Sequence, residues 1–147
     1  MFIFSGSSNQ PLAQKIAEAS GLTMGECSIQ DFSNGEKRIK ILSNVHGQDV
    51  VLVQSFSHPV DTHIMEFLLL ADALERAGAE KVIAVIPWMG YSLQDKVFTD
   101  GEPIAARVVA DIVSQSYVQR VMLLDLHNAG ITGFYSVPTV HVRALDL

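Results

Sequence analysis

The chain has 147 residues, 48% of them hydrophobic and 18% charged, which is typical of one globular domain and excludes a disordered segment. The formal net charge of −6 argues against a nucleic-acid-binding surface, which is normally basic. The single Cys27 excludes an intrachain disulfide and favours a reducing cytoplasm. Because no apolar run approaches about 20 residues and the N-terminus lacks a basic region, we expect neither a membrane span nor a signal peptide.

The N-terminal run Phe2-Ile3-Phe4 predicts a first strand, and the turn cluster from Ser5 to Asn9 separates it from a helix. Pro11 suits the first turn of that helix, and Gly21 suits its end. Backbone N–H groups of the cluster could hold an anion. The cluster has neither the lysine of a phosphate-binding loop nor the three-glycine dinucleotide pattern, so a helix-capping turn is the favoured interpretation.

Between Cys27 and Leu42 the pattern changes to two extended pieces around Ser33-Asn34-Gly35. Apolar and basic residues alternate in the second piece, and Asn-Gly between such segments predicts a β-hairpin. Phe32 beside the turn, with Glu36 nearby, could stack on an aromatic base and hydrogen-bond to it. Taken without further context, these residues favour a simple hairpin tip.

The β-branched run from Val50 to Val53 predicts an interior strand. A helix is expected to follow, with Asp61 or Thr62 as its N-cap and Ala77 near its end, before Gly78. Its apolar positions surround nearly the whole helix. We therefore expect this helix to lie between layers or to pack on another subunit.

The rest of the chain predicts a strand over 82–86, a helix from Pro103 to about Ser116, a strand over 121–124 and an extended piece over 137–142. Alternating strands and helices imply right-handed crossovers. The expected fold is α/β, with a mostly parallel central sheet and helices on both faces.

Polar clusters follow two of these strands, at Gly90–Gly101 and at Asp125-Leu126-His127. Ligands bind outside the carboxyl ends of strands in open parallel sheets, so we expect one shared site for a phosphorylated, metal-bound ligand. Gln94 can bond a base or phosphate, and Lys96 can neutralise phosphate charge. The alternative interpretation of this segment is a solvated surface loop.

Asp125 and His127 are two residues apart on a segment expected to be extended, which would point both side chains to one face. There a carboxylate can orient an imidazole or join it in binding a divalent ion. The alternative is an ordinary hydrogen-bonded histidine at a strand end. The remaining histidines form no zinc-type spacing with one another or with Cys27.

Five segments in a fixed order carry a family resemblance: Phe4-Ser5-Gly6, then Phe32-Ser33-Asn34-Gly35-Glu36, then Ile86-Pro87 with Gly90-Tyr91-Ser92-Leu93-Gln94-Asp95-Lys96, then Gly101-Glu102-Pro103-Ile104-Ala105-Ala106, and finally Asp125-Leu126-His127 with Gly133-Phe134-Tyr135. Together they resemble the N-terminal domain of ribose-phosphate pyrophosphokinase (phosphoribosyl pyrophosphate synthetase). The resemblance implies a phosphoribosyltransferase-like α/β fold. It also implies magnesium-dependent transfer of the β,γ-pyrophosphoryl group of ATP to the anomeric hydroxyl of ribose 5-phosphate.

The resemblance further implies individual roles. Phe32 would stack on adenine, often from a neighbouring subunit, and His127 would be associated with Mg²⁺. No residue is assigned as catalytic, and the remaining ATP contacts would come from Asn34, Gly35, Glu36, Leu93 and Gln94.

The chain departs from the family at Asn34 and Ser136, where Asp is common, and at Leu93, where Arg is usual. Losing a charge-assisted contact typically costs about 1.5–3 kcal/mol, so Leu93 should weaken nucleotide binding. The family's ribose-5-phosphate and flexible catalytic loops belong to a second domain, which nothing here matches. We therefore expect residues 1–147 to form a single N-terminal domain that lacks the C-terminal catalytic domain and is inactive alone.

Expected partners are ATP, ribose 5-phosphate through the second domain, and further copies of the chain in a homo-oligomer, with no nucleic acid or membrane. The main alternative is a non-catalytic relative that regulates or assembles with an active synthetase, which Leu93 and Asn34 support. A flavodoxin-like or receiver domain is disfavoured, because receiver domains need clustered acidic residues where this chain has Ser5-Gly6-Ser7.

Overall fold

The computed structural model describes residues 1–144 and has a six-stranded parallel sheet at its centre. Its strand order is β2-β1-β5-β6-β7-β8, and each neighbouring pair is parallel. The bounds are β1 (Phe2–Ser5), β2 (Thr23–Met24), β5 (Asp49–Val53), β6 (Lys81–Ile86), β7 (Arg120–Leu124) and β8 (Thr139–Val142). The predicted α/β fold with a mostly parallel sheet is confirmed.

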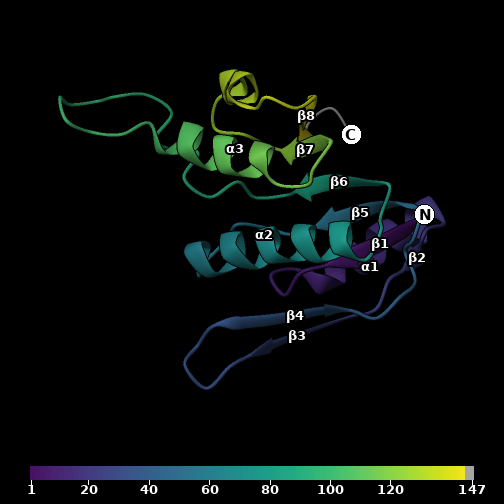
Figure 1. Cartoon of the computed structure of the whole chain (residues 1–147). Helices are drawn as coiled ribbons and strands as arrows, with labels where there is room; N and C mark the ends of the chain where they lie inside the picture. The colour runs from purple at the N-terminus through teal and green to yellow at the C-terminus, as the bar shows by residue number, and fades with distance from the viewer. Residues whose placement is uncertain (145–147) are drawn as a thin grey trace.

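Helices cover both faces of this sheet (Figure 1). Helix α1 (Gln10–Ser20) buries Ala13 and Ala17 on one face, against Ile3, Val51 and Val53. Helices α2 (Val60–Arg76) and α3 (Ala105–Gln115) cover the other face and form the larger core. The β-branched strand residues that suit a parallel sheet are thus buried between two layers of helix.

Helix α2 lies between the sheet and a separate two-stranded antiparallel sheet, which explains why its apolar residues surround it. This small sheet is the predicted hairpin, formed by β3 (Cys27–Asp31) and β4 (Lys37–Ile41). Figure 1 shows the hairpin running beside α2, with its turn at the same end as the start of α2. Met65 and Leu69 remain exposed on the helix, so part of its apolar surface faces solvent.

The expected N-cap of α2 is wrong. Pro59 occupies the N-cap position, and no side chain accepts a capping hydrogen bond from the first turn. Neither Asp61 nor Thr62 therefore caps the helix. In contrast, the turn before α1 does cap its helix, because Asn9 accepts a hydrogen bond from the Leu12 amide at 3.3 Å.

Two short elements were not predicted: strand β2 at the sheet edge and a 3-10 helix, η1 (Ala129–Phe134). Asn128 caps η1 through a 2.9 Å bond from the Gly130 amide. Both elements are too short to show a hydrophobic period. Among residues 1–144, no helix combines the length and apolar character needed to cross a bilayer.

Candidate functional site

The segments that follow β6 and β7 converge on one cavity of about 250 Å³ at the carboxyl edge of the sheet. The segment after β6 contributes Trp88, Met89, Ser92 and Leu93; the end of β7 and its following loop contribute Leu124, Asp125, Leu126 and His127. Leu93 lines this cavity and is 70% exposed, so its side chain is not packed into the core. The structure therefore brings Leu93 and His127 to one cavity at the strand ends, whereas Gln94 is not among the residues that line it.

Hydrogen bonds hold these two segments in place. The Asn128 side-chain amide donates to Asp95 at 2.8 Å, which ties the segment after β7 to the segment after β6. On the other side, Nε2 of His141 in β8 accepts a 3.0 Å bond from the Leu126 backbone amide. The backbone next to His127 is thus fixed from both neighbouring segments.

The expectation that Asp125 and His127 share a face through strand alternation is wrong. Strand β7 ends at Leu124, and Asp125 has a φ of 43°, in the left-handed region. Its Oδ1 accepts a 2.9 Å bond from the Ala144 amide. Both residues line the cavity, but the Asp125 carboxylate is engaged with the backbone after β8.

Among residues 1–144, no group of three or more His, Cys, Asp or Glu side chains is arranged to hold a metal ion. His127 and Asp125 are the two potential ligands that line the cavity. Mg²⁺ commonly takes only one or two protein ligands and completes its shell with water and substrate phosphates. These residues therefore fit an ion carried by a nucleotide better than a preformed metal site.

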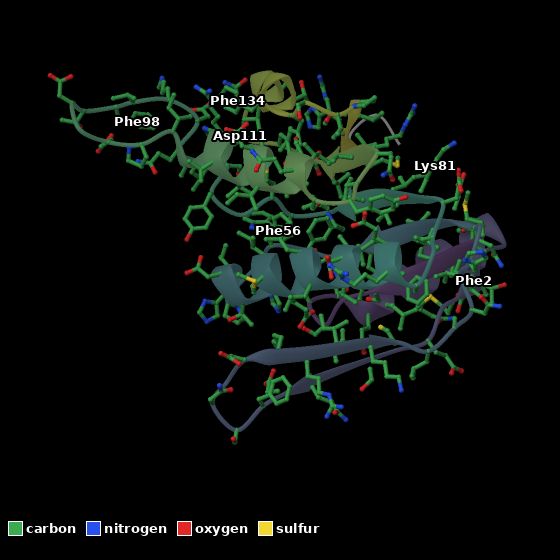
Figure 2. The ribbon with its side chains drawn as sticks, viewed as in Figure 1. Phe2, Phe56, Lys81, Phe98, Asp111 and Phe134 are labelled. Carbon is green, nitrogen blue, oxygen red and sulfur yellow. The ribbon has the colours of Figure 1, made fainter. Side chains whose placement is uncertain are left out.

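The loop after β6 is held by internal contacts, although residues 96–103 are exposed to solvent. Glu102 accepts bonds from two backbone amides of the loop, at Phe98 and Thr99, and the Lys96 ammonium group lies 5.1 Å from the centre of the Phe98 ring. Figure 2 shows Phe98 in the part of this loop that projects from the body of the molecule. Gln94 is half-buried, and its carbonyl accepts a bond from Ala106 in α3.

Tyr91, at the start of this loop, joins it to α2. Its hydroxyl donates to Asp61, and this bond raises the pKa of Tyr91. Tyr91 has a φ of 65°, which turns the chain at this point. Asp61, expected as a helix cap, thus serves as an anchor for the loop.

The hairpin tip forms a tight turn that presents Phe32. The Phe32 amide donates to the Glu36 carbonyl at 2.7 Å, and Gly35 has a φ of 87° that favours glycine. The Asn34 side-chain oxygen accepts from the Glu36 amide at 3.2 Å. Phe32 is 49% exposed, and the Arg38 guanidinium lies 5.8 Å from its ring centre, a contact that the sequence analysis missed.

Within one chain, the hairpin tip and the Leu93–His127 cavity do not meet. In Figure 1 the hairpin lies beyond α2, whereas β7 and η1 lie on the other side of that helix. The predicted ATP-contacting residues thus fall into two groups. No residue of the hairpin is among those that line the cavity.

A buried carboxylate that the sequence analysis missed fills the crevice where the strand order reverses, between β1 and β5. Glu66 of α2 is fully buried, and its two oxygens accept from the Ser7 amide at 2.6 Å, the Ser7 hydroxyl at 2.9 Å and the Gln54 side chain at 2.9 Å. Ligands commonly bind at such a switch point. Here the turn after β1 binds the carboxylate of Glu66, which belongs to the same chain, in the place of an external anion.

Gly6 permits this close packing. A Cβ atom on Gly6 would lie 2.1 Å from the Gln54 side-chain oxygen, which itself accepts from the Ser8 hydroxyl at 2.7 Å. A larger residue would displace Gln54 from Glu66. Glycine thus leaves the room in which Gln54 keeps its bonds to Glu66 and Ser8.

Two titratable groups lie beside Glu66. The Lys37 ammonium is 2.9 Å from Asp31 and 3.5 Å from Glu66; the bond to Asp31, with the charge of Glu66, raises the pKa of Lys37 although burial opposes the shift. Burial, followed by the charge of Glu66, raises the pKa of Cys27. The thiol of Cys27 is thus less readily ionised than an exposed one.

Comparison with known proteins identifies the family of this chain. Residues 1–116 match the family model for the N-terminal domain of ribose phosphate pyrophosphokinase. The ribose-phosphate pyrophosphokinase of Fusobacterium nucleatum is 46% identical over 145 residues, which are 99% of this chain and 46% of that protein. This chain belongs to the ribose-phosphate pyrophosphokinase family.

Further relatives extend the match past residue 116 to His127. Ribose-phosphate pyrophosphokinase 2 of Enterococcus faecalis is 41% identical over 99% of this chain and 45% of its own length. The crystal structure of phosphoribosylpyrophosphate synthetase from Mycobacterium smegmatis superimposes with a TM-score of 0.93 at 34% identity, covering 97% of this chain and 48% of that one. The chain thus spans about half the length of these members of the ribose-phosphate pyrophosphokinase family.

Proposed function

We propose that this chain is the ATP-binding N-terminal half of a ribose-phosphate pyrophosphokinase and acts in the cytoplasm. The main support is the cavity shared by Leu93 and His127, at the ends of two strands, in a chain of this family. The reaction joins ATP and ribose 5-phosphate to give phosphoribosyl pyrophosphate and AMP. A second domain would supply the ribose 5-phosphate site and the catalytic loop.

In this proposal the nucleotide lies between two subunits. Phe32 of one hairpin stacks on adenine, supported by Asn34, Gly35 and Glu36 of the same tip. The other chain contributes Gln94 and the cavity next to His127, where bound Mg²⁺ would offset the triphosphate charge. Protein groups mainly position the substrates in such phosphoryl-type transfers.

Titration of the 147-residue chain with Mg-ATP by calorimetry tests the proposal. We expect measurable binding that weakens at least tenfold in His127→Ala, because the imidazole lines the cavity. His46→Ala, which changes an exposed histidine before β5 at the opposite edge of the sheet, should bind as the unchanged chain does. No AMP should form from ATP and ribose 5-phosphate, and its formation by the isolated chain would contradict the incomplete-enzyme part of the proposal.

A non-catalytic regulatory or assembly role is the second candidate. The exposed, uncharged Leu93 at the cavity favours it, since leucine can neither donate to phosphate nor offset its charge. This role predicts no heat on Mg-ATP addition. The same calorimetry therefore separates the two functions.

We also propose that the chain forms a homo-oligomer. A groove of about 440 Å³ between α2 and α3 is lined mainly by apolar side chains, including Ile64, Met65, Leu68, Val108, Val109 and Ile112. Covering it would remove exposed apolar area from water. The placement of the hairpin and of β7 on opposite sides of α2 also supports it, because in an oligomer the hairpin of one copy could reach the cavity of another.

Light scattering coupled to size-exclusion chromatography tests self-association. We expect an oligomer that Val108→Glu dissociates by placing a charge in the apolar groove. Leu42→Glu is the matched control, because Leu42 is 53% exposed and Val108 52%, but Leu42 lies outside the groove. A chain that stays monomeric at high concentration would contradict the proposal.

A further inference from the structure

The inward face of the hairpin changes from apolar to charged as it approaches the tip. Alternate residues of a strand share a face, and the inward cross-strand pairs from base to tip are Cys27–Ile41, Ile29–Ile39 and Asp31–Lys37. The first two pairs pack against the main core. The last pair places a lysine where the alternation of β4 would put an apolar residue.

This lysine reaches across to helix α2. Its ammonium group lies 2.9 Å from Asp31 on the paired strand and 3.5 Å from Glu66, which is fully buried. The Lys37 side chain is only 17% exposed, whereas Asp31 is 59% exposed. Lys37 is therefore a partly buried bridge between the hairpin and the helix.

The tip begins directly beyond this bridge. Asp31 is followed by Phe32, and Lys37 is preceded by Glu36, whose carbonyl accepts the amide bond that closes the turn. A two-stranded hairpin is marginally stable alone, and this one pairs with no other strand in residues 1–144. Its apolar contacts fix the base, and the Lys37 bridge is the inward contact nearest to the tip.

We propose that Lys37 is a positioning residue, which holds the tip end of the hairpin against Glu66 of α2 and so places Phe32 and Asn34 for the nucleotide. This inference rests on the proposed function for its ligand. Glu66 has three other donors, from Ser7 and Gln54, so its position persists without the lysine. What the lysine adds is the link from that fixed carboxylate to the hairpin.

Lys37→Met tests the link, because methionine keeps an unbranched side chain of similar reach and removes the charge. Lys40→Met is the matched control, since Lys40 lies on the same strand but on the outward, exposed face. Amide hydrogen exchange is read at Phe32, which donates across the tip, and at Leu42, which donates to Glu26 at the base. We expect about tenfold faster exchange at Phe32 in Lys37→Met alone, with Leu42 unchanged in both variants.

Titration of the same variants with Mg-ATP measures their affinity for the nucleotide, which would not change if Lys37 only stabilised the hairpin. Weaker binding by Lys37→Met and unchanged binding by Lys40→Met would support the proposal. Unchanged exchange at Phe32, or faster exchange with unchanged Mg-ATP affinity, would overturn it while leaving the proposed function intact. Absence of binding by the unchanged chain would instead overturn the proposed function, and the exchange result alone would then decide whether Lys37 positions the hairpin.

Discussion

Replacing Leu93 by arginine is expected to strengthen Mg-ATP binding by about tenfold to a hundredfold. A guanidinium at this position would add a charge-assisted contact to phosphate, typically worth about 1.5–3 kcal/mol. Leu93 is 70% exposed and lines the cavity with His127, so the substitution disturbs little packing. Calorimetric titration of the purified variant with Mg-ATP measures the change in affinity.

Val97→Arg is the control for this gain. Val97 lies in the same loop and is 49% exposed, but it does not line the cavity. It adds the same charge to the same acidic chain, so any general electrostatic attraction of ATP would appear in both variants. Equal affinities for the two variants would contradict a phosphate-contacting role for position 93.

Glu66→Ala should reduce the free energy of unfolding by about 3–5 kcal/mol, the usual cost of removing one partner from a buried charged group. The change leaves three hydrogen-bond donors from Ser7 and Gln54 without their acceptor, and it removes the buried countercharge of Lys37. It also opens a space at the fully buried position of the side chain. Urea denaturation followed by circular dichroism measures the loss.

Glu75→Ala provides the comparison, because Glu75 lies on the same helix but is exposed. Its replacement should change the stability by no more than about 0.5 kcal/mol. If Glu66→Ala also cost so little, the buried carboxylate would not hold the turn, the strand end and the helix together.

Much of the fold follows from local pattern in the sequence. Short apolar runs predict β1, β5, β6 and β7, and Asn34-Gly35 between alternating segments predicts the hairpin. The position of the cavity follows from topology, because parallel strands deliver their carboxyl ends to one edge. Leu93 and His127 therefore come together because β6 and β7 are parallel neighbours whose carboxyl ends lie at the same edge of the sheet.

What the sequence did not reveal depends on single backbone angles and on distant contacts. The φ of 43° at Asp125 breaks the strand alternation that was expected to align it with His127, and no local pattern marks that turn. Glu66 bonds to Ser7, 59 positions earlier in the chain. Its place in the buried stripe of α2 beside Phe67 and Leu70 was the available signal, since a charged residue on such a face needs a partner.

The carboxylate at the crevice between β1 and β5 also shapes where substrates can go. An incoming phosphate there would meet a like charge whose surrounding donors are already satisfied. Glu66 thus occupies the position that an external anion would otherwise take. Under the proposed function, this occupied crevice leaves the cavity at the ends of β6 and β7 as the place for the nucleotide phosphates.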